Sequence, residues 1–206
     1  MELFYSTTSP YARKARVFWR EKGLEGVIET ECNPFSDPPR LLRHGTLAKV
    51  PTLVTGDRVV YDSRIICEYL DSLKGERLAA LAGEQHWDML MAHAMTDRLL
   101  EYAIGLVLEN RRPANEQSPS AKERHELRIE RALRAMDEFI PRLAMLRPAF
   151  SLGHISFAVA LGYMDFRYAR LDWRARFPAL GDWYSAHELR PSLLQTQPSD
   201  HSTFAL

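Results

Sequence analysis

The pattern of apolar residues changes near residues 74–84, and this change most constrains the fold. Before it, short apolar runs such as "ELFYS" and "VIETEC" alternate with segments whose apolar residues recur at helical spacing. After it, almost every segment has helical spacing alone. The sequence therefore predicts an N-terminal unit built of strands and helices and a following unit built only of helices.

The N-terminal unit has the predicted order βαβ, then an irregular segment, then ββα. After the first strand, residues 10–22 have a helical pattern. The run "VPTLVTGDRVVYDS" is typical of two strands joined by a turn at Gly56 and Asp57. A helix capped by Ser63 is then expected to run to Leu73.

The C-terminal part predicts a helical bundle. The segment "ISFAVALGYMDF" is apolar on nearly all sides, so its helix belongs in the middle of the bundle. The helical patterns cover residues 84–111, 120–146, 152–171 and 177–189.

Composition narrows the class of protein. Acidic and basic residues balance at 27 each, so no overall field favours nucleic acid or an anionic membrane. No apolar run has the length of a membrane span, and the start "MELFYS" is a strand pattern and not a signal peptide. Cys32 and Cys67 form no CxxC motif, and the seven histidines are scattered. We therefore expect a cytoplasmic protein with no metal, no nucleic-acid partner and no membrane partner.

Three short motifs in the first unit combine structural and chemical signals. Ser9, followed by a proline and a tyrosine, stands where a strand gives way to a helix, and a helix N-terminus beside a hydroxyl suits an anion. Pro51 opens a strand, and an X–Pro bond is sometimes cis. Asp62 and Ser63 open the next helix, whose free N–H groups can bind a carboxylate. Taken singly, each motif is more typical of a helix cap or a strand start than of a ligand site.

Together the motifs resemble those of a known family. The stretches "TSPYARKARVFWREKGL", "AKVPTLVTGDRVVYDSRIICEYLD" and "LGHISFAVALGYMDFR" resemble the cytosolic glutathione S-transferase superfamily, and most of all its bacterial serine-type branch. The resemblance covers essentially the whole chain. It implies an α+β protein with a thioredoxin-like domain over residues 1–75, a helical-bundle domain over residues 84–206, and a homodimer.

The resemblance also implies roles for residues of the first domain. Ser9 matches the hydroxyl that faces the sulfur of glutathione. Val50 matches the residue before a cis-proline, here Pro51, whose backbone pairs with the cysteinyl amide of the peptide. Asp62 and Ser63 match the pair that holds the γ-glutamyl end.

The segment before Pro51 departs from the family pattern. Relatives have Asn-Pro-x-Gly-Lys-Val-Pro, whereas this chain has "GTLAKVP" over residues 45–51. Lys49 still matches a basic position that contacts the ligand in some branches. The missing proline and shifted glycine predict weaker glutathione binding or a mobile loop.

Two further features concern the helical domain. In the family the second substrate lies between the domains, and the candidate residues for this electrophile site are Tyr11, Tyr102, Leu106 and Arg111. Many relatives begin the third helix of this domain with a Ser/Thr-x-x-Asp capping box, where this chain has Ser151 followed by a histidine three positions later. That histidine is expected to be a buried structural group.

The motifs favour an enzyme that activates the glutathione thiolate. Its chemistry would be conjugation of a small hydrophobic electrophile, as in a detoxifying glutathione S-transferase, or reduction of a disulfide or peroxide. The turn at Ser9 carries no cysteine, so a dithiol cycle of the protein itself is disfavoured. The alternative from another class is a non-catalytic binding or regulatory protein with the same fold.

Overall fold

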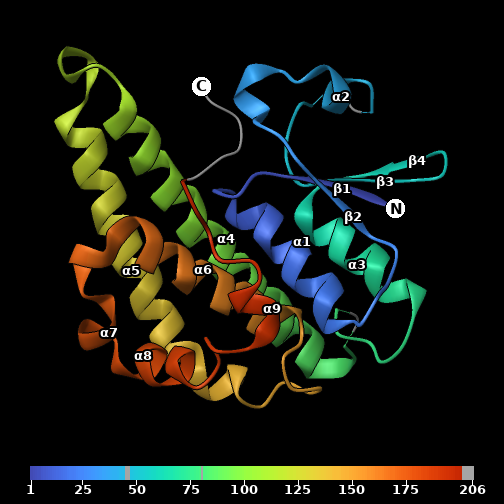
Figure 1. Ribbon diagram of the computed structural model, residues 1–206. Coiled ribbons are helices and arrows are strands. Elements are labelled where there is room, and N and C mark those ends of the chain that lie inside the picture. Colours follow the sequence, from blue (N-terminus) through green and yellow to red (C-terminus); the bar gives the residue numbers. More distant parts are fainter. Residues whose placement is uncertain (45–46, 80, 201–206) are drawn as a thin grey trace. The chain divides into compact units, whose positions relative to one another are not determined.

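The computed structural model describes residues 1–44, 47–79 and 81–200 (Figure 1). The chain forms two compact units. The first comprises Met1–Leu81 together with the segment that begins at Arg190, and the second comprises Ala82–Leu189. Each unit is described by itself.

The first unit contains short strands and helices in the predicted order. Its elements are β1 (Glu2–Tyr5), α1 (Pro10–Glu21), β2 (Ile28–Glu31), the 3-10 turn η1 (Pro34–Ser36), α2 (Pro39–Leu42), β3 (Thr52–Thr55), β4 (Arg58–Val60), α3 (Ser63–Leu73) and α9 (Pro191–Leu194).

Within the described residues the strands form one sheet in the order β2-β1-β3-β4. β1 is parallel to β2 and antiparallel to β3, and β3 is antiparallel to β4. Helices α1 and α3 lie on one side of this sheet and α2 on the other (Figure 1). This arrangement confirms the predicted thioredoxin-like fold of the first unit.

Both faces of the sheet are buried, because successive residues of a strand point to opposite sides. On the α2 side, Phe4 packs with Cys32 and Leu41, and Val50 and Val54 pack against this cluster. The side chains of α1 and α3 that supply the other layer are fully buried: Ala12, Ala15, Val17, Phe18, Ile66 and Leu70.

The cap of α3 differs from the prediction. Asp62, and not Ser63, is the N-cap, and its carboxylate accepts a hydrogen bond from the backbone N–H of Arg64 at 3.1 Å. Ser63 is the first residue of the helix and is buried. Both residue types cap well, so the sequence alone could not choose between two adjacent candidates.

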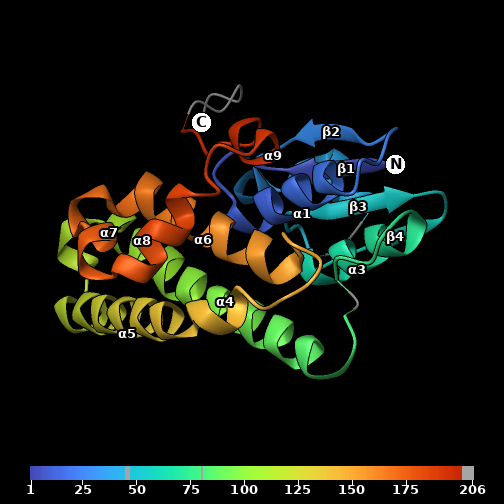
Figure 2. The same ribbon diagram turned by 90° about the horizontal axis from the view of Figure 1, so that it is seen from below.

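The second unit is all helical in its described residues. Its elements are α4 (Gly83–Arg111), η2 (Ala114–Glu116), α5 (Pro119–Leu143), α6 (Leu152–Tyr168), η3 (Ala169–Leu171), α7 (Trp173–Arg176) and α8 (Pro178–Ser185). α4 packs against both α5 and α6 (Figure 2). Every residue of α6 from Leu152 to Met164 is buried, which confirms its predicted place in the middle of the bundle.

At the start of α6 the histidine contacts the side chain of the N-cap residue, which makes no side-chain cap hydrogen bond to the helix backbone. Ser151 occupies the N-cap, and its hydroxyl lies 3.0 Å from Nδ1 of His154. The His154 ring lies 6.4 Å from the ring of Phe150 and 6.2 Å from that of Trp183, stacked on both. The histidine is therefore a buried structural group of the helical unit.

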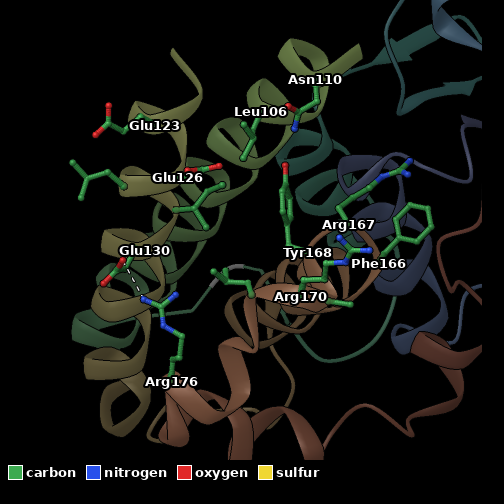
Figure 3. Close-up of a pocket in the computed structure, with 14 residues that line it drawn as sticks. Leu106, Asn110, Glu123, Glu126, Glu130, Phe166, Arg167, Tyr168, Arg170 and Arg176 are labelled. Atoms are coloured by element: carbon green, nitrogen blue, oxygen red, sulfur yellow. Dashed lines mark ion pairs between the residues drawn. The ribbon is translucent and has the colours of Figure 1, made fainter. Parts of the chain in front are cut away.

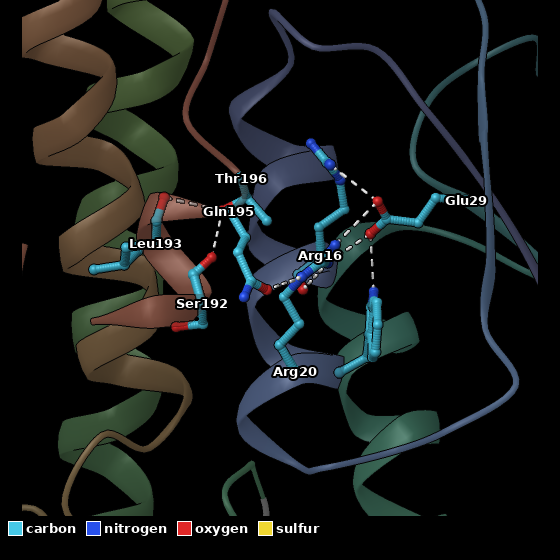
Figure 4. A network of polar contacts seen from close by, with 8 residues as sticks. Arg16, Arg20, Glu29, Ser192, Leu193, Gln195 and Thr196 are labelled. Atoms are coloured by element: carbon cyan, nitrogen blue, oxygen red, sulfur yellow. Dashed lines mark hydrogen bonds and ion pairs between the residues drawn. The ribbon is translucent and has the colours of Figure 1, made fainter. Parts of the chain in front are cut away.

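The segment that begins at Arg190, which contains α9, groups with the first unit. The reason is a set of polar contacts with α1. Nη2 of Arg13 donates to the carbonyl of Leu193 at 3.1 Å, and Arg190 pairs with Glu21 at 2.7 Å. Nε of Arg20 donates to the side-chain oxygen of Gln195 at 3.3 Å (Figure 4). Partners about 170 positions apart leave no signal in local periodicity.

Candidate functional site in the first unit

The three predicted motifs meet at one edge of the sheet. Phe4 of β1 is opposite Thr52 of β3, and Leu53 of β3 is opposite Val60 of β4. Because these strand pairs are antiparallel, the end of β1, the start of β3 and the end of β4 lie at the same edge. The turn to Ser9, the Val50–Pro51 bond and the start of α3 therefore all lie there.

Ser9 lies at the N-terminus of α1. It has an extended backbone, and its Oγ accepts a hydrogen bond from the N–H of Ala12 at 3.2 Å. Capping uses a lone pair of the oxygen and leaves the hydroxyl proton free to donate. Pro10 fills the first helical position, where no N–H is needed. The cap and a hydrogen bond to an anion are therefore compatible at this one side chain.

Val50 stands where the irregular segment enters the sheet. Its peptide bond to Pro51 is cis, the geometry that the resemblance implies. The Val50 side chain packs on the buried cluster around Phe4. Its backbone precedes the first residue of β3, Thr52, at the edge shared with Ser9.

Asp62 and Ser63 bring a second helix N-terminus to this edge. The Asp62 side chain is exposed, and one of its carboxylate oxygens caps α3. Together with α1, this places the positive ends of two helix dipoles at the same edge of the sheet, where they favour negatively charged groups. These two helix N-termini therefore favour an anionic group at this edge.

Lys49 is exposed in the segment that precedes the cis-proline. The two residues before Leu47, Gly45 and Thr46, lie outside the described residues. Ala48 has φ 48°, in the left-handed region that favours glycine. This is the position at which relatives have glycine, so the backbone keeps a glycine-type conformation although the side chain differs.

The cations after Ser9 have structural partners. Arg16 donates to Glu29 at 2.9 Å, and Arg20 donates to the other carboxylate oxygen at 2.6 Å (Figure 4). Burial raises the pKa of Glu29, but the hydrogen bonds from Arg20 and Arg16 outweigh it and lower this pKa to about 2. The guanidinium of Arg16 also lies 4.1 Å from the ring centre of Tyr5.

Burial raises the pKa of the other candidate reactive groups in the first unit, which are one phenol and two thiols. Burial raises the pKa of Tyr5, so its phenol is a weaker acid than usual. It also raises the pKa of Cys32 to about 11 and that of Cys67 well above its ordinary value. Both thiols are thus protonated at neutral pH and poor nucleophiles.

The four electrophile-site candidates belong to both units. Tyr11 lies in α1, with Nζ of Lys14 5.7 Å from its ring centre. Tyr102, Leu106 and Arg111 lie in α4 of the second unit. Of these three, Leu106 lines a hollow of that unit.

This hollow was not predicted from the sequence. It measures about 1000 Å³, and Figure 3 shows the side chains that line it. It is lined by Leu106, Asn110, Glu123, Glu126, Leu127, Ile129, Glu130, Phe166, Arg167, Tyr168, Ala169, Arg170, Leu171 and Arg176. All of these residues belong to the helical unit.

The described residues contain neither a cluster of metal ligands nor a membrane-spanning helix. Across 1–44, 47–79 and 81–200, no group of three or more His, Cys, Asp or Glu side chains is arranged to hold a metal ion. In the same ranges no helix is both long enough and apolar enough to cross a bilayer.

Comparison with known proteins identifies relatives along the whole chain. Residues 8–73 match the family model of the glutathione S-transferase N-terminal domain, and residues 119–186 match that of the C-terminal domain. A glutathione S-transferase of Methylobacillus flagellatus KT, solved with glutathione bound, is 33% identical with a TM-score of 0.87, covering 96% of this chain and 99% of that one.

Two further relatives have similar extents. A glutathione transferase family member of Pseudomonas fluorescens Pf-5, also solved with glutathione bound, is 33% identical with a TM-score of 0.89, covering 96% of this chain and 98% of that one. The uncharacterized GST-like protein YibF of Escherichia coli K12 is 28% identical over 201 residues, covering 96% of this chain and 98% of its own.

Proposed function

This chain belongs to the glutathione S-transferase family, and from this premise we propose that it is an enzyme that binds glutathione and activates its thiol. Ser9 donates a hydrogen bond to the sulfur. The backbone of Val50 beside Pro51 pairs with the cysteinyl amide, and Asp62 and Ser63 hold the γ-glutamyl end. Lys49 contributes a cation at the rim.

A helix N-terminus and one hydrogen bond can supply the free energy that lowers the thiol pKa. A free thiol has a pKa of about 8.5, and mostly ionised sulfur at neutral pH requires a decrease of about two units, or about 2.7 kcal/mol. The N-terminus of α1 contributes up to about 2 kcal/mol in a partly buried site. A hydrogen bond to a charged acceptor contributes about 1.5–3 kcal/mol. The two effects together are sufficient, and Ser9 need not ionise.

The proposed reaction is conjugation of the thiolate to a small hydrophobic electrophile by substitution. The sulfur lone pair forms a bond to an electrophilic carbon, and the displaced leaving group departs with its electron pair. The same thiolate can instead attack a disulfide, forming a mixed disulfide and releasing the other sulfur as a thiolate. With a peroxide it attacks one oxygen, the O–O bond breaks, the second oxygen leaves as alkoxide or hydroxide, and the glutathione sulfur is oxidised to the sulfenic acid as the peroxide is reduced. The electrophile is proposed to contact Tyr11, Tyr102, Leu106 and Arg111.

The observation that carries the proposal is the place of Ser9 at the N-cap of α1, at the sheet edge shared with Val50–Pro51 and the start of α3. Its test is a titration of the ultraviolet absorbance of the thiolate in bound glutathione. We expect Ser9→Ala to raise the thiol pKa by about one unit or more, because the hydrogen bond to sulfur is lost.

A matched control separates loss of a cap from loss of activation. Ser118 caps α5 in the helical unit by the same bond, with its Oγ accepting from the N–H of Ala121 at 3.3 Å. Ser118→Ala should leave the thiol pKa unchanged. A Ser9→Ala enzyme that kept the wild-type thiol pKa and full transferase activity would remove Ser9 from this role.

The same titration distinguishes the non-catalytic alternative. Absence of glutathione binding at millimolar peptide would favour a binding or regulatory protein with this fold. We also propose that the protein is a homodimer, and sedimentation of the full chain tests this oligomeric state. Its proposed location is the cytoplasm.

A further inference from the structure

The hollow of the helical unit carries opposite charges on two of its walls (Figure 3). One wall is α5, where Glu123, Glu126 and Glu130 follow one another at spacings of three and four residues and so share a helix face. The other wall is formed by the chain after α6, which contributes Arg170 and Arg176.

Part of this charge is neutralised within the protein. Glu130 pairs with Arg176 at 3.1 Å across the hollow and with Arg134 at 3.1 Å along α5. Among the residues that the structure describes, neither Glu126 nor Arg170 takes part in an ion pair. The Glu126 carboxylate and the Arg170 guanidinium therefore line the hollow without an ion-pair partner among the described residues, and a ligand can engage them.

Apolar side chains also line the hollow, beside the polar Asn110 and Tyr168. Leu106 lines it from α4, Leu127 and Ile129 from α5, and Leu171 from η3. Tyr168 stands in the middle, and its hydroxyl donates to the carbonyl of Ala103 at 2.5 Å (Figure 3).

The pKa of Tyr168 and the direction of the Glu126 side chain describe this interior further. Burial raises the pKa of its phenol, with a smaller contribution from the charge of Glu126, so the hydroxyl stays neutral at physiological pH. Figure 3 shows Glu126 on the side of α5 toward Leu106, whereas Glu123 is turned away. Glu126 is therefore the carboxylate that faces this space.

We propose that this hollow is a second ligand site, separate from the glutathione site, and that it takes a zwitterion with an apolar body. The cationic group pairs with Glu126, the acidic group pairs with Arg170, and the hydrocarbon part covers Leu127 and Leu171. All lining residues belong to the helical unit, so the proposal does not rest on glutathione chemistry.

Charge complementarity favours a zwitterion over a neutral, a purely anionic or a purely cationic ligand. A neutral apolar molecule would cover Glu126 and Arg170 without satisfying them, which costs free energy. A purely anionic amphiphile would face the glutamates of α5, and a purely cationic one would face the arginines. The volume of about 1000 Å³ is sufficient for a small organic molecule.

The test uses 8-aminooctanoate, which joins an ammonium and a carboxylate through a hydrocarbon chain. Its binding to the full chain is measured by calorimetry at low ionic strength beside octanoate and octylammonium, each of which has only one of the charges. We expect one molecule to bind per chain, about tenfold more tightly than either single-charge analogue. Equal affinity for all three compounds, or no binding of 8-aminooctanoate, would overturn the proposal.

Variants locate the site. Glu126→Gln and Arg170→Gln should each weaken 8-aminooctanoate binding about tenfold, since each removes one charged partner. Glu138→Gln and Arg131→Gln change exposed residues of α5 outside the hollow and should leave the affinity within about twofold. If Glu126→Gln and Arg170→Gln bind like these controls, the ligand lies elsewhere and the site is wrong.

Failure of this proposal and failure of the proposed function are distinguishable. Glutathione binding is titrated separately on the same variants, which leave the residues of the first unit intact. A chain that binds 8-aminooctanoate but not glutathione would remove the transferase proposal and keep the second site. The reverse result would remove the second site alone.

Discussion

The ammonium group of Lys22 lies 3.1 Å from the carboxylate of Asp71, and the two side chains are only 2% and 1% exposed. Lys22 directly follows α1, and Asp71 lies near the end of α3, so the pair ties the ends of the two helices together. The same carboxylate accepts hydrogen bonds from the backbone N–H groups of Leu78 and Ala79 at 2.8 and 3.2 Å. It therefore also holds the segment that follows α3.

We predict that Asp71→Asn destabilises the protein strongly. The variant leaves the Lys22 ammonium buried without a counter-charge, and removing one partner of a buried pair typically costs about 3–5 kcal/mol. The free energy of unfolding in urea measures this. Glu101→Gln, which breaks an exposed pair with Arg98, is the control and should cost about 0.5 kcal/mol or less. Equal small losses in both variants would contradict the prediction.

The ion pairs of Glu29 predict a specific loss of stability in acid. Its folded pKa of about 2 lies below the ordinary value of 4.5, so the ionised form is favoured by folding. A lowered pKa contributes stability that is fully present above the unfolded value and is lost as the pH falls from about 4.5 toward 2.

The comparison is between the wild type and Glu29→Gln, which removes the titrating group and retains its size. At neutral pH we expect the wild type to be more stable by about 2 kcal/mol, a value discounted for the part of this side chain that solvent screens. The difference should shrink as the pH falls below about 4.5, as measured by urea unfolding at each pH. A difference that does not depend on pH would show that Glu29 stabilises only by packing.

Ser9→Asp separates the two roles that the proposal assigns to this side chain. Aspartate caps a helix as well as serine does, so the variant should keep the wild-type melting temperature, whereas Ser9→Ala should lose about 1 kcal/mol of stability. The added negative charge beside the sulfur should raise the thiol pKa of bound glutathione above that of the wild type. A lowered or unchanged thiol pKa in Ser9→Asp would place the sulfur away from this residue.

Local patterns predicted most of the fold. Strand alternation in "VIETEC" and the turn at Gly56 predicted β2 and the hairpin of β3 and β4, and both are confirmed. The run after Ser151, which is apolar on nearly all sides, predicted the central helix α6. The short helix α9 was missed, because its place depends on Arg13 and Glu21 of α1, which lie far away in the sequence. Periodicity reports which face of a helix is buried and not which partner covers it.

The candidate site was predictable to the extent that its residues sit in short motifs. Ser9 and Asp62 carry cap signals, and both are N-caps in the structure. The hollow of the helical unit had no such signal. Its wall residues Glu126 and Arg170 come from helices that only tertiary packing brings together, and charges on an exposed helix face usually mean solvation.

The backbone at Ala48 predicts that glycine is the better residue there. Its φ of 48° lies in the left-handed region, which costs about 1 kcal/mol or more for a residue with a Cβ and little for glycine. Ala48→Gly should therefore raise the free energy of unfolding by about 0.5–1 kcal/mol, although glycine also loosens the unfolded chain. Gly23, with φ 57° after α1, is the reverse control, and Gly23→Ala should lower stability by about 1 kcal/mol.

If Ala48→Gly destabilises the protein, the greater entropy that glycine gives the unfolded chain outweighs the relief of backbone strain at this position. If both variants behave as expected, the segment before Pro51 keeps a glycine-type conformation at the cost of stability.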